Sequence, residues 1–362
     1  MTDTTAQADR TGWAPLPDRY EAFWGGEIPP DGHVIAHVQH PNPAPDPPAP
    51  WMRAPGEAKY LDPPKLLALK RWRAHKLCRL HDHFARVSPD FGPNMFAGFI
   101  GAKVIFGADT VWAEPVAPSL EQAEALHFDP DNRLYRAYLA ALDYFLEHRR
   151  PDEWVPNTDS GGVTDWLAAC MGTEPFLLAT IEQPDRMRDL ALRLARECNQ
   201  ALEAAFARLE RQGWWVNWMP VGSAEPFPTV QDDMAVNFSP TMYRRVFGPA
   251  LAEQGRFAPR CLLHWHDASA HHVPVLAEMD AIQVIQYGHD PNTGPFREQL
   301  DAMRTLQAAD KRLLLACVEP EDAAFFLEHL DPGKLLLVVE TPGAAASRRM
   351  SEFLAAWQPK EG

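Results

Sequence analysis

Two histidines close an apolar run in the C-terminal half of the chain. The run 261–263 leads into His264 and His266, with Trp265 between them and Asp267 after them. Residues i and i+2 of a β-strand project to the same face, so both imidazoles can reach one point just past a strand's end. Two imidazoles, a carboxylate and an open position form a catalytic zinc type of site. The spacing therefore predicts a metal site, and metal-free contact of the histidines with substrate is the alternative.

The third metal ligand is expected from the end of another strand. Glu340 ends the last long apolar run of the chain, and Cys317 ends the run before it. The strands of a parallel barrel open at one mouth, so either side chain can approach the two histidines. We therefore expect Zn²⁺ to be held by His264, His266 and Glu340, with Cys317 as the alternative ligand.

Two adjacent acids, Asp232 and Asp233, precede the segment 238–240. We expect one carboxylate to point into the mouth as a general acid or base, and the other to cap or brace the loop. His264 and His266 complete the predicted catalytic set. Other side chains at predicted strand ends and loops are candidates for substrate binding: Asn94, Glu114, Asp159, Trp218, Tyr287 and His289. Of these, the aromatic pair Trp218 and Tyr287 is expected to wall the pocket.

Strands and helices alternate in the second half of the chain, and they must position these residues. Repeated βα units of about 25 residues imply a parallel sheet, and roughly eight of them imply a (β/α)8 TIM barrel. Helical periodicity also predicts amphipathic helices over residues 64–87, 133–149 and 185–212. The expected strands cover residues 214–219, 229–236, 260–266, 281–286, 312–317 and 334–340.

The first 64 residues differ from the rest in their Pro-rich runs, such as residues 41–48. Such runs favour extended conformations over helices or central strands. We expect residues 1–64 to form an extended arm that wraps the barrel or a neighbouring subunit, and residues 65–362 to form the barrel. A disordered leader is the alternative, but interspersed aromatic residues favour packing, and with it a homodimer.

Composition excludes several classes of partner. The chain has 362 residues and a formal charge of −15, which argues against nucleic acid and anionic membranes. Its five cysteines are scattered and form no C-x-x-C pair, as expected of reduced thiols. Apolar runs are too short to span a membrane, and the N-terminus is polar, so a cytoplasmic protein acting on a small molecule is expected.

Several stretches resemble the uroporphyrinogen decarboxylase superfamily, which also holds the cobalamin-linked methyltransferases. The resemblance extends over about residues 85–357, and the order and spacing of the motifs carry it. It implies a TIM barrel. The motifs are DWLAACMGTE at residues 165–174, IEQPDRM at 181–187, QDD at 231–233 before FSPTMY at 238–243, and LHWH at 263–266.

The sequence departs from the family pattern at two motifs, and these departures affect which reaction the resemblance implies. The decarboxylases carry an Arg-rich motif for substrate carboxylates, and residues 50–57 keep Arg53 of it but lose the Gln and the second Arg. The methyltransferases hold zinc with His-x-Cys and a distant Cys. His264 matches their His, His266 stands at their first Cys, and Glu340 lies about where the second would be. A His-His-Glu ligand set is chemically harder than a His-Cys-Cys set, so it favours activation of an oxygen group or water over activation of a thiol.

The function expected from these features is zinc-assisted methyl or group transfer on a small molecule, with a corrinoid-bound methyl carrier on a partner protein. The first alternative is a metal-free decarboxylase of a porphyrin-like or aromatic acid, in which Arg53 and the histidines bind carboxylates. A metal-dependent hydrolase, similar in logic to the amidohydrolase barrels, is the second. Titratable groups crowded at the mouth argue against a non-enzymatic binding protein.

Overall fold

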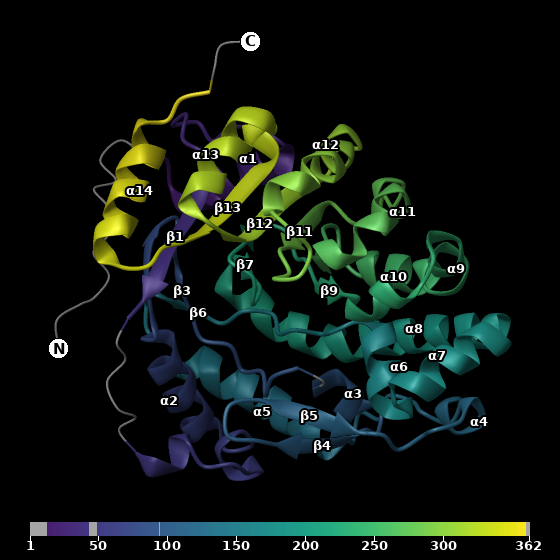
Figure 1. The fold of residues 1–362 in the computed structure, drawn as a ribbon. Helices are drawn as coiled ribbons and strands as arrows, with labels where there is room; N and C mark the ends of the chain where they lie inside the picture. Colours follow the sequence, from purple (N-terminus) through teal and green to yellow (C-terminus); the bar gives the residue numbers. More distant parts are fainter. Residues whose placement is uncertain (1–12, 43–48, 94, 360–362) are drawn as a thin grey trace.

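A computed structural model describes residues 13–42, 49–93 and 95–359. The fold is mixed α/β, with a central sheet covered by many helices (Figure 1). The seven-stranded sheet has the order β2-β1-β13-β12-β11-β10-β9, and its neighbours are parallel except for the antiparallel pair β1 and β2. Its strands are β1 (Ile35–Pro41), β2 (Leu77–His81), β9 (Thr229–Gln231), β10 (Leu262–His266), β11 (Val284–Gly288), β12 (Arg312–Val318) and β13 (Leu335–Glu340).

The strands of this sheet are nearly continuous apolar runs because they are buried on both faces. All five residues of β11 are buried, and β13 is buried up to Glu340. Helices follow the parallel strands, as predicted for this half of the chain. They are α9 (Pro240–Val246), α10 (Gly248–Gly255), α11 (Val273–Ala277), α12 (Leu300–Ala308), α13 (Pro320–His329) and α14 (Ala344–Ala356).

A second set of short strands flanks the sheet. β3 (Ala85–Arg86) is parallel to β6 (Glu153–Trp154), an isolated parallel bridge joins Asn157 to Asn217, and β7 (Trp215–Val216) forms a hairpin with β8 (Gly222–Ser223). Ser160 Oγ donates to the Thr229 carbonyl at 2.6 Å, which ties this set to β9. In the described part of the chain, backbone ladders do not join the two sets into one closed sheet. The parallel α/β sheet is confirmed, and the closed barrel stays a prediction.

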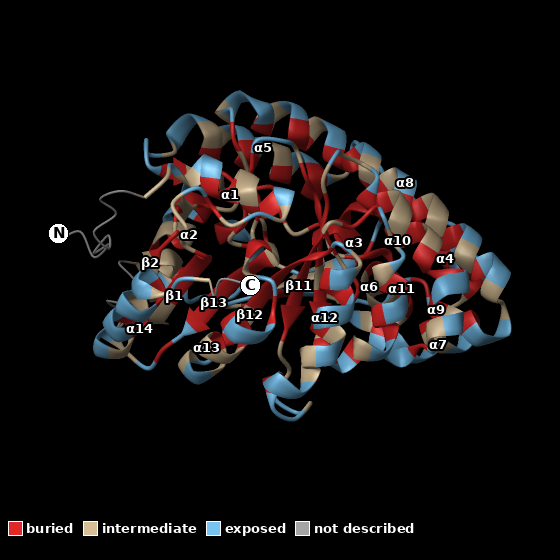
Figure 2. Ribbon diagram, turned by 90° about the horizontal axis from the view of Figure 1, so that it is seen from above, coloured by how far each residue is buried: buried red, intermediate tan, exposed pale blue. Residues whose placement is uncertain are grey.

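Helices from the middle of the chain form a layer beside the second set of strands. The long helix α8 begins at Pro184 with an acid in its first turn, and it leads through a 3-10 turn to Gly213 in the left-handed conformation, as a helix end favours. Figure 2 shows the buried sides of these helices turned toward the interior. The layer comprises α2 (Pro63–Ala74), α3 (Met95–Phe99), α4 (Leu120–Ala123), α5 (Arg133–His148), α6 (Val163–Met171), α7 (Thr173–Glu182) and α8 (Pro184–Leu209), with the hairpin β4 (Lys103–Phe106) and β5 (Val111–Glu114).

The expected N-terminal arm is wrong for the described residues before residue 42. They form α1 (Leu16–Gly25) and the strand β1, which lies inside the sheet between β2 and β13. Tyr20 and Phe23 of α1 are buried in the core. The Pro-rich residues 43–48 lie outside the described residues. Residue 64 is therefore not the start of the core, because the sheet needs β1 as the neighbour of β13.

The helix expected over residues 64–87 is correct only for its first half. α2 ends at Ala74, and β2 then pairs antiparallel with β1. Periodicity cannot separate a short strand from a helix when apolar residues are closely spaced, so pairing with β1 decides the structure. Among the described helices, none combines the length and apolar character that crossing a membrane requires.

Candidate functional site

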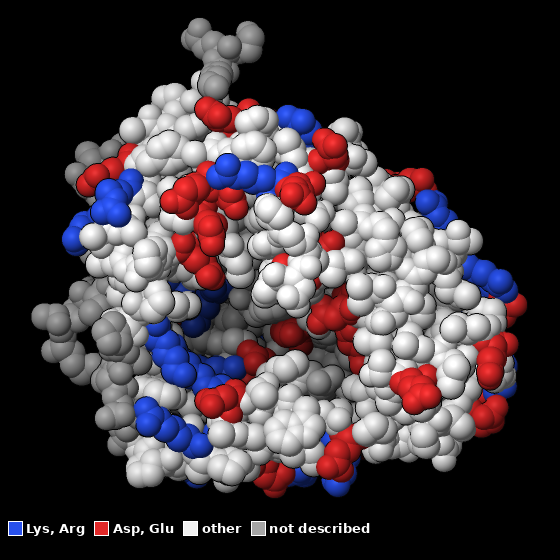
Figure 3. Space-filling model, viewed as in Figure 1, with Lys and Arg blue, Asp and Glu red and all other residues white. Residues whose placement is uncertain are grey.

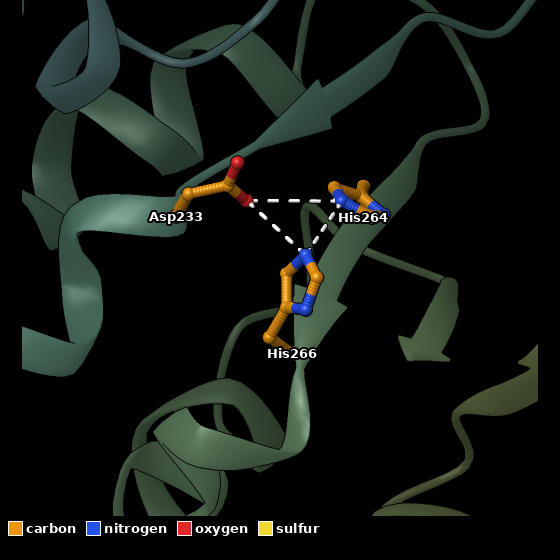
Figure 4. Close-up of side chains that lie close together, drawn as sticks. All are labelled: Asp233, His264 and His266. Atoms are coloured by element: carbon orange, nitrogen blue, oxygen red, sulfur yellow. Dashed lines mark hydrogen bonds and ion pairs between the residues drawn. The ribbon is translucent and has the colours of Figure 1, made fainter. Parts of the chain in front are cut away.

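The two histidines of β10 meet Asp233 at the carboxyl end of the sheet (Figure 4). His264 Nε2 and His266 Nε2 lie 3.1 Å apart, and Asp233 Oδ1 lies 3.7 Å from each. Asp233 follows β9, which neighbours β10 in the sheet. In the described chain, this is the one group of three His, Cys, Asp or Glu side chains whose ligand atoms all lie within 4.8 Å of one another.

These three atoms fit the ligand set of one small divalent ion. A tetrahedral zinc ion with bonds of about 2.0–2.1 Å holds its ligands roughly 3.3 Å apart. The observed separations of 3.1 and 3.7 Å bracket that value. Three protein ligands leave a fourth position for water or substrate, as catalytic rather than structural zinc sites do.

Each imidazole is oriented by a partner on its other nitrogen. His266 Nδ1 lies 2.9 Å from Asp290 Oδ1, and His264 Nδ1 contacts Oε1 of Gln286, the residue opposite it on β11. Both partner atoms are acceptors, so each Nδ1 donates its proton and each Nε2 of a neutral ring carries a lone pair. Two lone pairs 3.1 Å apart repel unless a cation or a proton lies between them. Burial lowers the pKa of His264, which favours its neutral, metal-binding form.

The loop after β11 holds Asp290 in place through the buried carboxylate of Asp267. Asp267 Oδ1 accepts from the Asp290 amide at 3.0 Å, and Oδ2 accepts from Thr293 Oγ1 at 2.8 Å. His289 Nδ1 also lies 2.6 Å from Asp267 Oδ2. His289, expected to bind substrate, thus helps to fix the loop that orients His266.

Replacing Asp290 with alanine is expected to weaken zinc binding about 10- to 100-fold, because His266 would lose the acceptor that fixes its tautomer and ring orientation. Competition titration of Zn²⁺ against a chromophoric chelator would measure the change. Asp290→Asn is the matched control, since its side-chain oxygen can still accept from Nδ1, and it should lose less affinity. Equal affinities of Asp290→Ala and the unmodified chain would contradict this role.

The two adjacent acids point in different directions, as expected, whereas the general acid or base role of either one stays a prediction. Asp233 faces the histidines, whereas Asp232 is buried and accepts from Thr164 Oγ1 and, at 2.6 Å, from Tyr243 Oη. Burial raises the pKa of Asp232 to about 7. Asp165 accepts from the Met234 amide at 3.1 Å, which fixes the turn that carries Asp233. Asp232 therefore braces the loop, and Asp233 is presented to the site.

A cavity of 440 Å³ adjoins Asp233 and Gln231. Asp159 and Asp165 line it, and burial raises the pKa of both, that of Asp159 to about 7. Gly162 lets these loops meet, because a Cβ there would lie 1.7 Å from the Gln231 carbonyl oxygen. The aromatic wall of this cavity is formed by Phe96, Trp112 and Trp166.

Asp159→Asn is expected to make the free energy of unfolding less sensitive to a rise in pH. Because folding raises the pKa of Asp159, its protonated form stabilises the fold at acid pH, and that contribution is lost as pH rises through about 7. When the pH is raised from 5.5 to 8, the free energy of unfolding of the variant should increase by about 1–3 kcal/mol relative to that of the unmodified chain, as measured by urea unfolding. Asp152→Asn, at an exposed position, is the control and should show no such gain. An unchanged pH profile of stability for Asp159→Asn would contradict the prediction.

Trp218 lies beside the histidines, and Tyr287 does not. The Trp218 ring packs against His264, with 5.5 Å between the ring centroids, and its role as a wall of the substrate pocket stays a prediction. Tyr287 is fully buried on the helix side of β11, with its ring 6.4 Å from Phe296. Side chains alternate along a strand, so Gln286 faces the site and Tyr287 turns away from it.

Two other expected substrate contacts, Glu114 and Arg53, lie away from the histidines. Glu114 is exposed on the β4–β5 hairpin and pairs with Lys103 at 2.5 Å. Arg53 is exposed after the short 3-10 helix Pro50–Met52, and it is not among the residues that line the cavities around the site. Asn94 lies outside the described residues.

Glu340 and Cys317, expected as the third ligand, do not join the histidines in this structure. β13 stands three places from β10 in the sheet, and at about 4.8 Å per strand this is on the order of 14 Å. Glu340 Oε1 instead accepts from Gln39 Nε2 at 3.1 Å. Cys317 adopts a left-handed φ of 59° at a bulge in β12, and burial with the nearby Glu340 raises its pKa. Asp233 occupies the position expected for Glu340 as the third candidate ligand, because β9 neighbours β10.

Sequence reasoning missed the residues that support the ligands. Gln286 could be found only from the register of β10 on β11, which no local pattern reveals. Asp290 follows His289 directly, and that acid after a strand end was an available signal. Asp165, which holds the turn that carries Asp233, lies in the first turn of α6.

Comparison with known proteins shows similarity of fold. No family model matches the chain, and no curated protein sequence matches it significantly. The solved structure of a methyltransferase from Methanosarcina mazei is similar, with a TM-score of 0.59 and 14% identity over 94% of this chain and 97% of that one. An intracellular xylanase from Thermoanaerobacterium saccharolyticum reaches a TM-score of 0.35 at 10% identity, over 93% of this chain and 90% of that one, and carries no argument.

Proposed function

We propose that this chain is an enzyme of metal-assisted group transfer, with methyl transfer on a small molecule as its reaction. The observation that carries the proposal is the approach of two Nε2 atoms to 3.1 Å, with Asp233 3.7 Å from each. Partners on both Nδ1 atoms leave the two lone pairs aimed at one point. Such an arrangement is stable when a cation occupies that point.

The fold favours methyl transfer within this class. A solved structure whose fold resembles this chain over nearly its whole length is that of a methyltransferase. We place the chain as a divergent member of the uroporphyrinogen decarboxylase superfamily, so that the sheet and the flanking strands form the two parts of its barrel. The methyl carrier would be a corrinoid on a partner protein, as in the cobalamin-linked branch.

Residues around the site have distinct roles in this reaction. His264, His266 and Asp233 would hold Zn²⁺, which when bound would polarise a substrate oxygen or activate a bound nucleophile. Asp159, with a pKa of about 7, can give or accept a proton at neutral pH in the cavity beside Asp233. Trp218 shields His264 from solvent on one side.

A metal-dependent hydrolase is the second candidate, and the ligand set is what favours it. Nitrogen and oxygen ligands make a harder site than one with thiolates, and harder sites suit water or oxygen nucleophiles. The open fourth position would serve either reaction.

Metal content and acceptor dependence test the proposal. The untagged chain should bind about one Zn²⁺ per molecule by elemental analysis, and transfer from methylated small molecules should need both the metal and a corrinoid acceptor. Turnover without any acceptor would establish the hydrolase instead. A chain that binds no metal at its histidines, in the presence of excess Zn²⁺, would overturn both.

A further inference from the structure

A separate small cavity is lined by residues of β1, β2, β12 and β13. It has a volume of 160 Å³, and the side chains of Arg79 and Arg86 line it together with Gln39 and Glu340. Arg79, Gln39 and Glu340 stand in one row across β2, β1 and β13. In Figure 3 the centre of the molecule is hollowed, with basic side chains on the left of the hollow and acidic ones on its right.

The two arginines have no carboxylate partner among the described residues. Arg86 donates to the carbonyl oxygens of Asn217 at 3.3 Å and Trp218 at 2.7 Å, and Arg79 donates to that of Ala74 at 3.2 Å. Glu340, the one acid among the described residues of the cavity wall, accepts from Gln39 and lies beside Cys317 instead. Most of the donor capacity of both guanidinium groups is therefore available to a ligand.

This arrangement is electrostatically costly without an anion. Burial, together with the nearby positive charge of Arg79, lowers the pKa of Arg86 to about 10. Two like charges removed from water are stabilised when an anion is placed between them. Guanidinium groups suit a carboxylate in particular, because their paired N–H groups match its two oxygens.

Trp218 connects this cavity to the candidate metal site. Its carbonyl oxygen accepts from Arg86, and its ring packs against His264. Arg86 is thus linked to His264 through the single residue Trp218. At roughly 30 Å³ per water molecule, the cavity has room for a group the size of a short carboxylic acid.

We propose that Arg79 and Arg86 form a subsite for the carboxylate of the substrate, so that the enzyme acts on a small carboxylic acid whose reacting group reaches His264 and His266. This substrate class rests on the proposed function, since it places the reaction at the histidines. The anion subsite itself needs neither metal nor turnover.

Binding of propionate to the full-length chain, stripped of metal by a chelator, tests the subsite. Isothermal titration and saturation-transfer NMR should detect propionate but not neutral propionamide at the same concentration. Arg79→Gln and Arg86→Gln should each weaken propionate binding at least about 10-fold. The exposed Arg348→Gln, on α14, is the matched control and should bind as the unmodified chain does.

Further arms separate the possible failures. If thermal unfolding shows that Arg86→Gln is unfolded, Arg86→Lys, which keeps the charge, replaces it. Weaker propionate binding by Arg86→Lys and by Arg79→Gln would support the paired-guanidinium site. His266→Ala should bind propionate normally, so loss of the metal site leaves this result unchanged. Equal binding of propionate and propionamide, undiminished binding in Arg79→Gln and the Arg86 variant, or binding of inorganic phosphate without propionate would overturn the proposal.

Discussion

His266→Ala is expected to abolish stoichiometric zinc binding and to lower metal-dependent transfer about 10³-fold. The substitution removes one of three ligands and the Nε2 atom that lies 3.1 Å from His264. Polarisation by a bound metal is worth several kcal/mol in a transition state, and about 1.4 kcal/mol corresponds to a factor of ten in rate. Elemental analysis and steady-state rates with the corrinoid acceptor would measure the two effects.

A matched histidine separates loss of the site from general damage. His127 is exposed, and its ring contacts only a local carbonyl, that of Ala125, so His127→Ala should keep both metal and activity. His264→Ala should behave as His266→Ala does. Asp233→Ala should lose metal as well, whereas Glu340→Ala should retain it. Loss of zinc in Glu340→Ala but not in Asp233→Ala would restore Glu340 as the third ligand.

The second large effect concerns stability and the N-terminal segment. Arg19→Leu is expected to destabilise the fold by about 3–5 kcal/mol, because it leaves a buried carboxylate without its partner. Arg19 and Asp82 are both fully buried, and Arg19 Nε lies 2.8 Å from Asp82 Oδ1. Arg19 also pairs with Asp31 and donates to the Val34 carbonyl at 3.2 Å. One guanidinium thus ties α1 to the strands β1 and β2.

Urea unfolding of the full-length chain at pH 7 would measure this change, with Arg348→Leu as the exposed control. The control should unfold within about 0.5 kcal/mol of the unmodified chain. A double variant, Arg19→Leu with Asp82→Leu, should recover part of the loss, since the buried charge of Asp82 is removed while Asp31 still lacks its arginine. A small effect of Arg19→Leu would mean that residues 13–41 fold as a separable arm, as their Pro-rich surroundings first suggested.

The sequence carried enough local information to predict most of the second half of the chain. Apolar runs followed by helical periodicity predicted β10 to β13 and the helices after them, because burial on both faces leaves a plain pattern. The H-x-H spacing also predicted two imidazoles on one face, and they do converge. The first half was harder, since its strands β3 and β6 are only two residues long and its helix α2 passes quickly into β2.

Local patterns alone therefore determined which side chains could do chemistry at the end of β10, and that a parallel sheet would present them. Tertiary structure decided which acid meets them. Asp233 lies on the loop after the neighbouring strand, whereas Glu340 ends a strand three places away. Strand order across a sheet depends on contacts between distant parts of the chain, and so does the place of Ile35–Pro41 inside it. No spacing along the sequence records that order, because it arises only when the core is assembled.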